Sequence, residues 1–168
     1  KNTRNEATIF QEQVALAMKT DELILIHTPH LEDKLPGTKM ILDMLHGESR
    51  VNPQRVCVDH VEEHTIGPVL DSGFWCGMTL YPITKCTPAR AVDMIENFGD
   101  DRIMVNSAGD WGPSNQLAVS DFIHEMRMRG HAENKIRKIV YENPIAFFSQ
   151  SRNWTFERTE FLQSVSSE

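Results

Sequence analysis

Two short apolar runs decide the fold of this chain: ELILIH at residues 22–27 and RVCVDH at residues 55–60. Each run has the length of a strand, lacks the polar alternation of a half-exposed strand, and ends at a histidine. Continuous apolar runs of this length are typical of strands buried on both faces, as in a parallel sheet covered by helices. The two runs therefore predict neighbouring parallel strands.

Outward from these runs, strand-like and helical segments alternate along the chain. Two further strands are predicted at residues 74–81, before Pro82, and at residues 102–106. Because strands that alternate with helices form parallel sheets, the sequence predicts an α/β fold. Stop signals at glycines and a Thr-Pro cap delimit the helices. The predicted helical segments are 6–19, 37–47, a patch that begins at Thr65 as its cap and ends at Gly73, 87–99, about 117–129, about 133–141 and about 143–149.

Composition and charge limit the class of protein. The hydrophobic content of 40% and charged content of 24% are ordinary for a soluble globular domain, and no run approaches the ~20 apolar residues of a membrane-spanning helix. No linker interrupts the pattern, which predicts one domain over residues 1–168 with a C-terminal tail from about residue 151. The net charge of −7 and the scattered basic residues argue against long nucleic acid as a partner. Three cysteines without CxxC spacing favour a reducing, cytoplasmic location, with Cys57 and Cys76 buried.

Polar side chains follow each predicted strand. A Rossmann fold is compatible with the number of strands, but no strand is followed by GxGxxG or GxxxxGK[ST]. In a (β/α)8 barrel, by contrast, the active site forms at the carboxyl ends of the strands, where such residues would gather. The residues at these ends are His27 and His30, then Asp59, His60 and His64, then Thr79 to Tyr81, and finally Asn106, Ser107 and Asp110.

His27 and His60 are the strongest candidate metal ligands. They are 33 residues apart, about one βαβ repeat, which predicts equivalent positions on adjacent strands. Imidazole and carboxylate groups bind Zn²⁺ and similar ions, and such an ion lowers the pKa of a bound water to about 7. An alternative interpretation is that each histidine is a hydrogen-bonded loop residue.

The other polar residues carry weaker expectations. His30 and His64 are candidates for substrate binding or for solvated positions. Trp111 is either a loop anchor or a wall of the substrate cleft. Glu62 and Glu63 are expected to be surface or helix-entry charges, and His46 and His124 are expected to be exposed residues of helices.

At these residues the chain resembles the C-terminal half of the TatD-like metal-dependent hydrolases of the amidohydrolase superfamily, from about residue 1 to 150. The resemblance rests on FQEQVALAM before a strand ending in IHTP, on VCVDH, on DRIMVNSAGDWGPSN and on ENPIAFF. It implies a (β/α)8 TIM barrel of which this chain supplies strands five to eight, with His27 and His60 as metal ligands. The family's HxH or HxD motif on strand one and its Glu after strand four would then lie upstream of Lys1. Since a half barrel has two open sheet edges, the missing N-terminal half or a second copy of the chain is the expected partner.

The position of the family's last acidic ligand is open. In the family an Asp follows strand eight, and direct alignment places Ala108 there. Asp110 lies two residues later, and positions of the same parity point the same way on a strand. We therefore expect Asp110 to serve as metal ligand and general base, whereas equivalence to Ala108 would place hydrolysis in doubt.

The resemblance implies a metal-dependent hydrolase that uses metal-activated water on a phosphodiester, ester or amide bond. The expected cofactor is a divalent cation (Zn, Mn or Mg; one or two ions), and the expected substrate is a small molecule or a short phosphodiester. A catalytically inactive barrel that acts as a binding or scaffold protein is the alternative function. A third interpretation is an unrelated α/β domain whose histidines are incidental.

Overall fold

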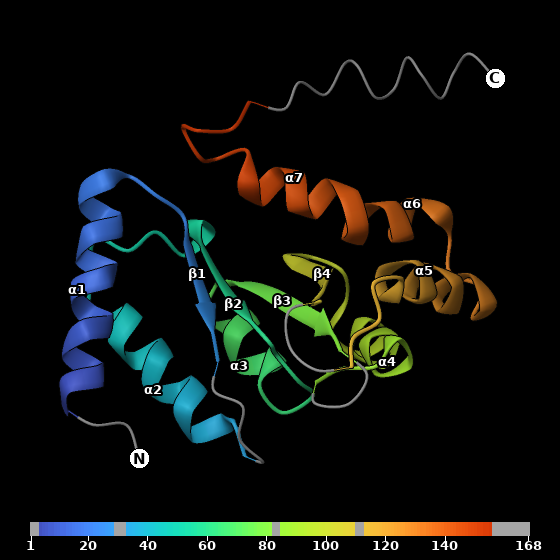
Figure 1. Cartoon of the computed structure of the whole chain (residues 1–168), viewed down its shortest axis with the longest axis horizontal. Helices are drawn as coiled ribbons and strands as arrows, with labels where there is room; N and C mark the ends of the chain where they lie inside the picture. The colour runs from blue at the N-terminus through green and yellow to red at the C-terminus, as the bar shows by residue number, and fades with distance from the viewer. Residues whose placement is uncertain (1–3, 29–32, 82–84, 110–112, 156–168) are drawn as a thin grey trace.

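A four-stranded parallel sheet forms the centre of the molecule (Figure 1). The computed structural model describes residues 4–28, 33–81, 85–109 and 113–155. Its strands pair in chain order, β1-β2-β3-β4, so that each βα unit adds a strand beside the previous one. The predicted α/β fold with parallel strands is confirmed. The strands are β1 (Ile24–His27), β2 (Val56–Asp59), β3 (Trp75–Leu80) and β4 (Ile103–Ser107).

Helices connect the strands and follow the last one. Thr87 caps α4 as predicted, because its side chain accepts a hydrogen bond from the Arg90 backbone N–H. Thr65 is the N-cap residue of α3 as predicted, but its hydroxyl makes no capping hydrogen bond and accepts instead from the backbone N–H of Glu62. The helices are α1 (Arg4–Thr20), α2 (Leu35–His46), α3 (Ile66–Asp71), α4 (Pro88–Phe98), α5 (Ala118–Met128), α6 (Glu133–Arg137) and α7 (Asn143–Phe148), with a 3-10 turn η1 (Pro53–Arg55).

The two faces of the sheet are covered by different elements. Alternate strand residues such as Ile26, Val58 and Met78 belong to the main apolar core, which they share with buried side chains of the helices. Residues of the opposite parity, Cys57 and Trp75 among them, form a second cluster with Phe147 and Met104. Phe147 belongs to α7, so the C-terminal helix covers the face that a closed barrel would turn inward. Figure 1 shows α7 apart from α1 to α5, over the amino ends of the strands.

The C-terminal helical segments are continuous rather than separate. A π-helical turn, η2 (Lys138–Glu142), joins α6 to α7 where the sequence predicts a break near residue 142. Pro144 lacks the backbone N–H that an α-helix would donate to residue 140, which explains the widened turn. The buried side chain of Asn143 connects this region to β4 and the segment before it. Its Nδ2 donates to the carbonyl oxygens of Asp100 and Ile103, both at 2.7 Å.

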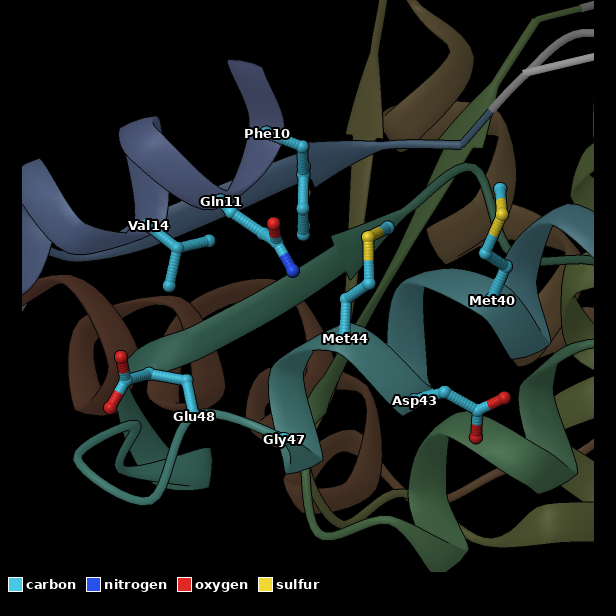
Figure 2. Close-up of a pocket in the computed structure, with 8 residues that line it drawn as sticks. All are labelled: Phe10, Gln11, Val14, Met40, Asp43, Met44, Gly47 and Glu48. Atoms are coloured by element: carbon cyan, nitrogen blue, oxygen red, sulfur yellow. The ribbon is translucent and has the colours of Figure 1, made fainter. Parts of the chain in front are cut away.

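β1 is one of the two edge strands of the sheet and lies beside α1. A hollow of about 440 Å³ separates α1 from α2 and is lined by Phe10, Val14 and Met44 (Figure 2). On β1 itself, Leu25 is 48% exposed although its neighbours Ile24 and Ile26 are buried. Among the described residues, no helix combines the length and the apolar character that crossing a membrane requires.

Candidate metal centre

The carboxyl ends of all four strands contribute a side chain to one place. His27 and Asp59 are the last residues of β1 and β2 and are register partners. Thr79 on β3 and Asn106 on β4 are also register partners and have the same parity within the sheet. Because equivalent positions of parallel strands share one face, these four side chains converge at the carboxyl edge, as the sequence predicts for His27.

His60 joins this group only because its backbone turns back. A residue that follows Asp59 in an extended strand would point to the opposite face of the sheet. His60 has φ of +64°, the left-handed region, which costs a residue with a side chain about 1–2 kcal/mol. This turn directs the ring toward β1, where His60 Nε2 lies 2.9 Å from His27 Nδ1 and the ring centroids are 4.7 Å apart.

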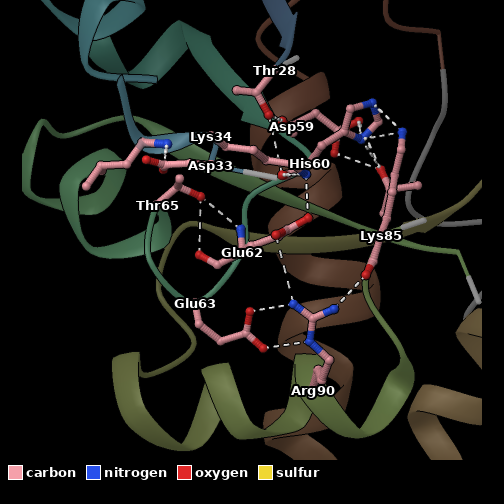
Figure 3. Close-up of polar contacts among 12 residues, drawn as sticks. Thr28, Asp33, Lys34, Asp59, His60, Glu62, Glu63, Thr65, Lys85 and Arg90 are labelled. Carbon is pink, nitrogen blue, oxygen red and sulfur yellow. Dashed lines mark hydrogen bonds and ion pairs between the residues drawn. The ribbon is translucent and has the colours of Figure 1, made fainter. Parts of the chain in front are cut away.

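Asp59 is the hub of the polar contacts in the centre (Figure 3). Its carboxylate accepts hydrogen bonds from the Thr79 hydroxyl at 3.0 Å and from Asn106 Nδ2 at 3.1 Å. It also lies 3.4 Å from His27 Nδ1 and 3.3 Å from His60 Nδ1. Only 7% of Asp59 is exposed, and a buried carboxylate is tolerated when it is paired in this way.

The hydrogen bonds around Thr79 indicate the tautomer of His60. The single proton of the Thr79 hydroxyl is donated to Asp59, while Thr79 Oγ1 lies 2.7 Å from His60 Nδ1. Thr79 Oγ1 must therefore accept from a protonated Nδ1. The lone pair of His60 is then left on Nε2, the atom that faces His27. This arrangement is the one by which metal-binding histidines are usually oriented.

Burial is the main reason that the pKa of the His60 imidazole is lowered to about 4. The Asp59 carboxylate raises this pKa, and the ammonium group of Lys85 lowers it. His60 is therefore neutral at physiological pH, the form in which imidazole binds a metal. The cysteines near the sheet are free and buried, and burial raises the pKa of the Cys57 thiol well above its ordinary value. Cys57 is therefore protonated at physiological pH.

A cavity of about 350 Å³ opens in front of these residues. Lys85, from the segment after β3, extends into it and places its Nζ 2.7 Å from His60 Nε2. Ala108, which follows β4, also lines the cavity. The residues of the full lining are His27, Asp59, His60, Thr79, Lys85, Asn106, Ser107, Ala108 and Gly109.

The donor set fits a divalent cation. His27, Asp59 and His60 offer one ligand atom each, and these atoms lie within 4.8 Å of one another. Bonds of about 2.0–2.2 Å in tetrahedral geometry would separate ligand atoms by roughly 3.3 Å. The His27–Asp59 distance of 3.4 Å is close to that value, and the 2.9 Å between the imidazole nitrogens is slightly shorter. Since His27 is exposed, the arrangement also leaves room for water or substrate.

The structure does not bring every candidate residue into this centre. His64 is exposed and lies before α3, outside the cavity lining among the described residues. His30, Asp110 and Trp111 lie outside the described residues. Glu62 is not a surface charge but lies at the entry to α3, the other position expected for it: its carbonyl accepts from the Ile66 backbone N–H, and its side chain is 16% exposed and pairs with the buried Lys34. The expectations for Glu63, His46 and His124 as exposed residues, and for Cys57 and Cys76 as buried ones, are confirmed.

Asp59, Thr79, Asn106 and Lys85 received no role from the sequence. Asp59 carries a recognisable signal, because it is a carboxylate that ends a run of four buried strand residues. Such a residue must find partners in the interior. Thr79 and Asn106 become visible only when the register is known. Lys85 follows the strand by several residues, and no spacing rule places it beside His60.

Comparison with known proteins agrees with this geometry. No family profile matches the chain. A metal-dependent hydrolase of uncharacterized function from Methanocaldococcus jannaschii is 28% identical over 146 residues, which cover 87% of this chain and 57% of that protein.

Two solved structures share the fold. A TatD-like protein from Archaeoglobus fulgidus superposes with a TM-score of 0.66 and 24% identity, over 88% of this chain and 55% of that protein. A β-aspartyl dipeptidase from Fervidobacterium islandicum superposes with a TM-score of 0.64 and 14% identity, over 88% of this chain and 44% of that protein. The chain thus spans a little over half of the relative that it matches in sequence. The chain is therefore similar in sequence to a metal-dependent hydrolase and similar in fold to a TatD-like protein.

Proposed function

We propose that the chain carries metal-binding strand ends of a metal-dependent hydrolase, with His27 and His60 as ligands. The observation that supports this proposal most directly is the 2.9 Å approach of His27 Nδ1 and His60 Nε2 at the mouth of a polar cavity. The similarity to a metal-dependent hydrolase supports the same chemistry. The ion would be Zn, Mn or Mg, and one or two ions would be held together with residues beyond this chain.

The residues of the chain would have different roles at this site. A divalent metal supplies polarisation of the scissile bond and a more acidic water. Asp59 and Thr79 hold the His60 ring so that Nε2 faces the cavity. Lys85 brings a positive charge to the same space, which suits a negatively charged substrate group. The bond cleaved would be a phosphodiester, ester or amide in a small molecule or a short phosphodiester, given the net charge of −7.

Asp110 is the proposed general base and a further metal ligand. It follows Gly109, the last described residue before it and part of the cavity lining. His30, His64 and Trp111 are proposed substrate contacts. The presence of Ala108 in the cavity lining favours the alternative function, an inactive barrel that binds without hydrolysis, because Ala108 supplies no carboxylate.

Asp110→Asn distinguishes the two functions. Removing a general base typically costs 10²–10⁴-fold in rate, while an asparagine of the same size should leave the fold intact. We expect hydrolysis of bis(p-nitrophenyl) phosphate, with Mn²⁺ present, to fall by at least 100-fold in this variant. The assay should use the chain together with the partner proposed below, which is the N-terminal half of the barrel or a second copy of the chain.

Asp121→Asn is the matched control, since Asp121 lies on α5 and is exposed. An unchanged rate in Asp110→Asn would refute Asp110 as the base. Absence of hydrolysis in every variant, with metal still bound, would support the inactive barrel.

The exposed edge at β1 is the proposed binding site of a partner. Leu25 is 48% exposed, and Ile9 and Leu16 on α1 are 57% and 59% exposed. A groove of about 410 Å³ runs between α1 and β1. We propose that a missing N-terminal half of the barrel, or a second copy of the chain, covers this edge.

The variant Leu25→Asp tests whether a second copy of the chain binds at the β1 edge. If copies pair at β1, the isolated chain should sediment at twice its mass of 19.2 kDa, and the variant should sediment as a monomer with an unchanged circular dichroism spectrum. Glu12→Lys, on α1, serves as a charge-change control. A wild-type chain that stays monomeric at 100 µM, a concentration that would populate dimers with a Kd of about 10 µM, would exclude the second copy and leave only the other half of the barrel.

A reducing, cytoplasmic location remains a proposal. It is supported by Cys57, Cys76 and Cys86, which are all free thiols.

A further inference from the structure

A buried lysine contacts the backbone of His60, a residue of the candidate metal centre. Lys34 precedes α2, and only 2% of it is exposed. Its Nζ lies 2.5 Å from Glu62 Oε1 and 3.3 Å from the backbone carbonyl oxygen of His60 (Figure 3). Burying an ammonium group is costly unless it is paired and hydrogen-bonded, so the position of Lys34 calls for an explanation.

The group that Lys34 contacts is the residue with the unusual backbone. His60 has φ of +64°, and this turn is what directs its ring into the cavity. A strained backbone of this kind persists only where its surroundings over-determine it. The His60 carbonyl accepts from Lys34 Nζ at 3.3 Å, and the Thr28 hydroxyl donates to the adjacent carbonyl of Asp59 at 3.0 Å, so two residues of the segment after β1 bind the backbone of the turn after β2.

The same contacts continue toward the next strand. Glu62 lies 4.0 Å from Arg90, and Arg90 forms a two-pronged ion pair with Glu63. Arg90 also donates to the backbone carbonyl of Lys85 at 2.7 Å. The charged residues under the cavity therefore connect the segments that carry His60 and Lys85, as the dashed lines in Figure 3 show.

We propose that Lys34 is a positioning residue, which fixes the left-handed turn at His60 and thereby aims His60 Nε2 at the metal. The proposal rests on the proposed function for its consequence, metal affinity, but its geometric content concerns the His60 ring alone. Ion pairs as buried as Lys34–Glu62 contribute little to stability compared with apolar residues of similar size. A role in orientation explains this buried pair better than a role in stability.

The experiment compares the variants Lys34→Met and Lys34→Met/Glu62→Gln with the wild-type chain. The double variant avoids leaving the Glu62 carboxylate buried without its partner, which alone could prevent folding. Lys138→Met is the matched control, because Lys138 pairs with Asp100 and Asp101 away from the cavity. The measurements are the ¹⁵N and ¹H resonances of the histidine rings without metal, the Zn²⁺ dissociation constant, and the midpoint of thermal unfolding.

We expect the His60 ring resonances to shift in the double variant while those of His131, which contacts Glu96 of α4, stay in place. The Zn²⁺ dissociation constant should rise 10–100-fold, the range typical of residues that orient metal ligands. The thermal midpoint should fall no further than in Lys138→Met. Unchanged His60 resonances would overturn the proposal, and so would a wild-type Zn²⁺ affinity in a double variant whose rings have shifted. A wild-type chain that binds no Zn²⁺ would refute the proposed function, while the ring resonances would still decide the role of Lys34.

Discussion

Replacing His60 with alanine is expected to weaken Zn²⁺ binding by more than 100-fold. Residues that only orient metal ligands typically contribute 10–100-fold to affinity, so loss of a ligand itself should exceed that range. His60 Nε2 and His27 Nδ1 are 2.9 Å apart, and an ion between them would lose half of its imidazole donors in either variant. His27→Ala should therefore have an effect of the same order. Competition with a chromophoric chelator measures both constants.

The effect should be specific to this pair of histidines. His124→Ala is the control, since His124 is an exposed residue of α5. It should bind Zn²⁺ as the wild-type chain does. Equal Zn²⁺ affinity in His27→Ala, His60→Ala and His124→Ala would contradict the metal centre.

Gly77→Ala should destabilise the chain and disturb the same centre. A Cβ at residue 77 would lie 2.4 Å from Asp59 Oδ1 and 3.2 Å from Asp59 Cα, so the carboxylate would have to move. Overpacking of this kind costs about 1–3 kcal/mol. The displaced carboxylate would also lose its geometry toward Thr79 and Asn106, which are its main hydrogen-bond donors. We expect a lower urea midpoint together with weaker Zn²⁺ binding.

Gly47→Ala provides the comparison. Gly47 has φ of −68°, and the nearest atom to its added Cβ is at 3.4 Å, an ordinary contact. This variant should be neutral or slightly more stable, by up to about 1 kcal/mol, since alanine restricts the unfolded chain. If Gly77→Ala unfolded at the same urea concentration as Gly47→Ala, the close packing of Asp59 against β3 would be refuted.

The predictions for His60 and Gly77 differ in whether the sequence alone could have given them. The role of His60 can be proposed from sequence, because the residue follows an apolar strand and lies one βαβ repeat after His27. The role of Gly77 cannot. A glycine within a strand indicates a close approach of some group, and only the pairing of Asp59 with Gly77 identifies that group.

The sequence by itself determined the order of strands and helices, because uninterrupted apolar runs, caps and glycine stops are local signals. It also placed His27 and His60 at one edge of the sheet, since carboxyl ends of parallel strands coincide. The tertiary structure alone decided that both rings reach one cavity, through the reversed backbone at His60, and that Asp59, Thr79 and Lys34 support them. These contacts join residues 19 to 33 positions apart, and they depend on strand register and on one backbone torsion, neither of which a local pattern encodes.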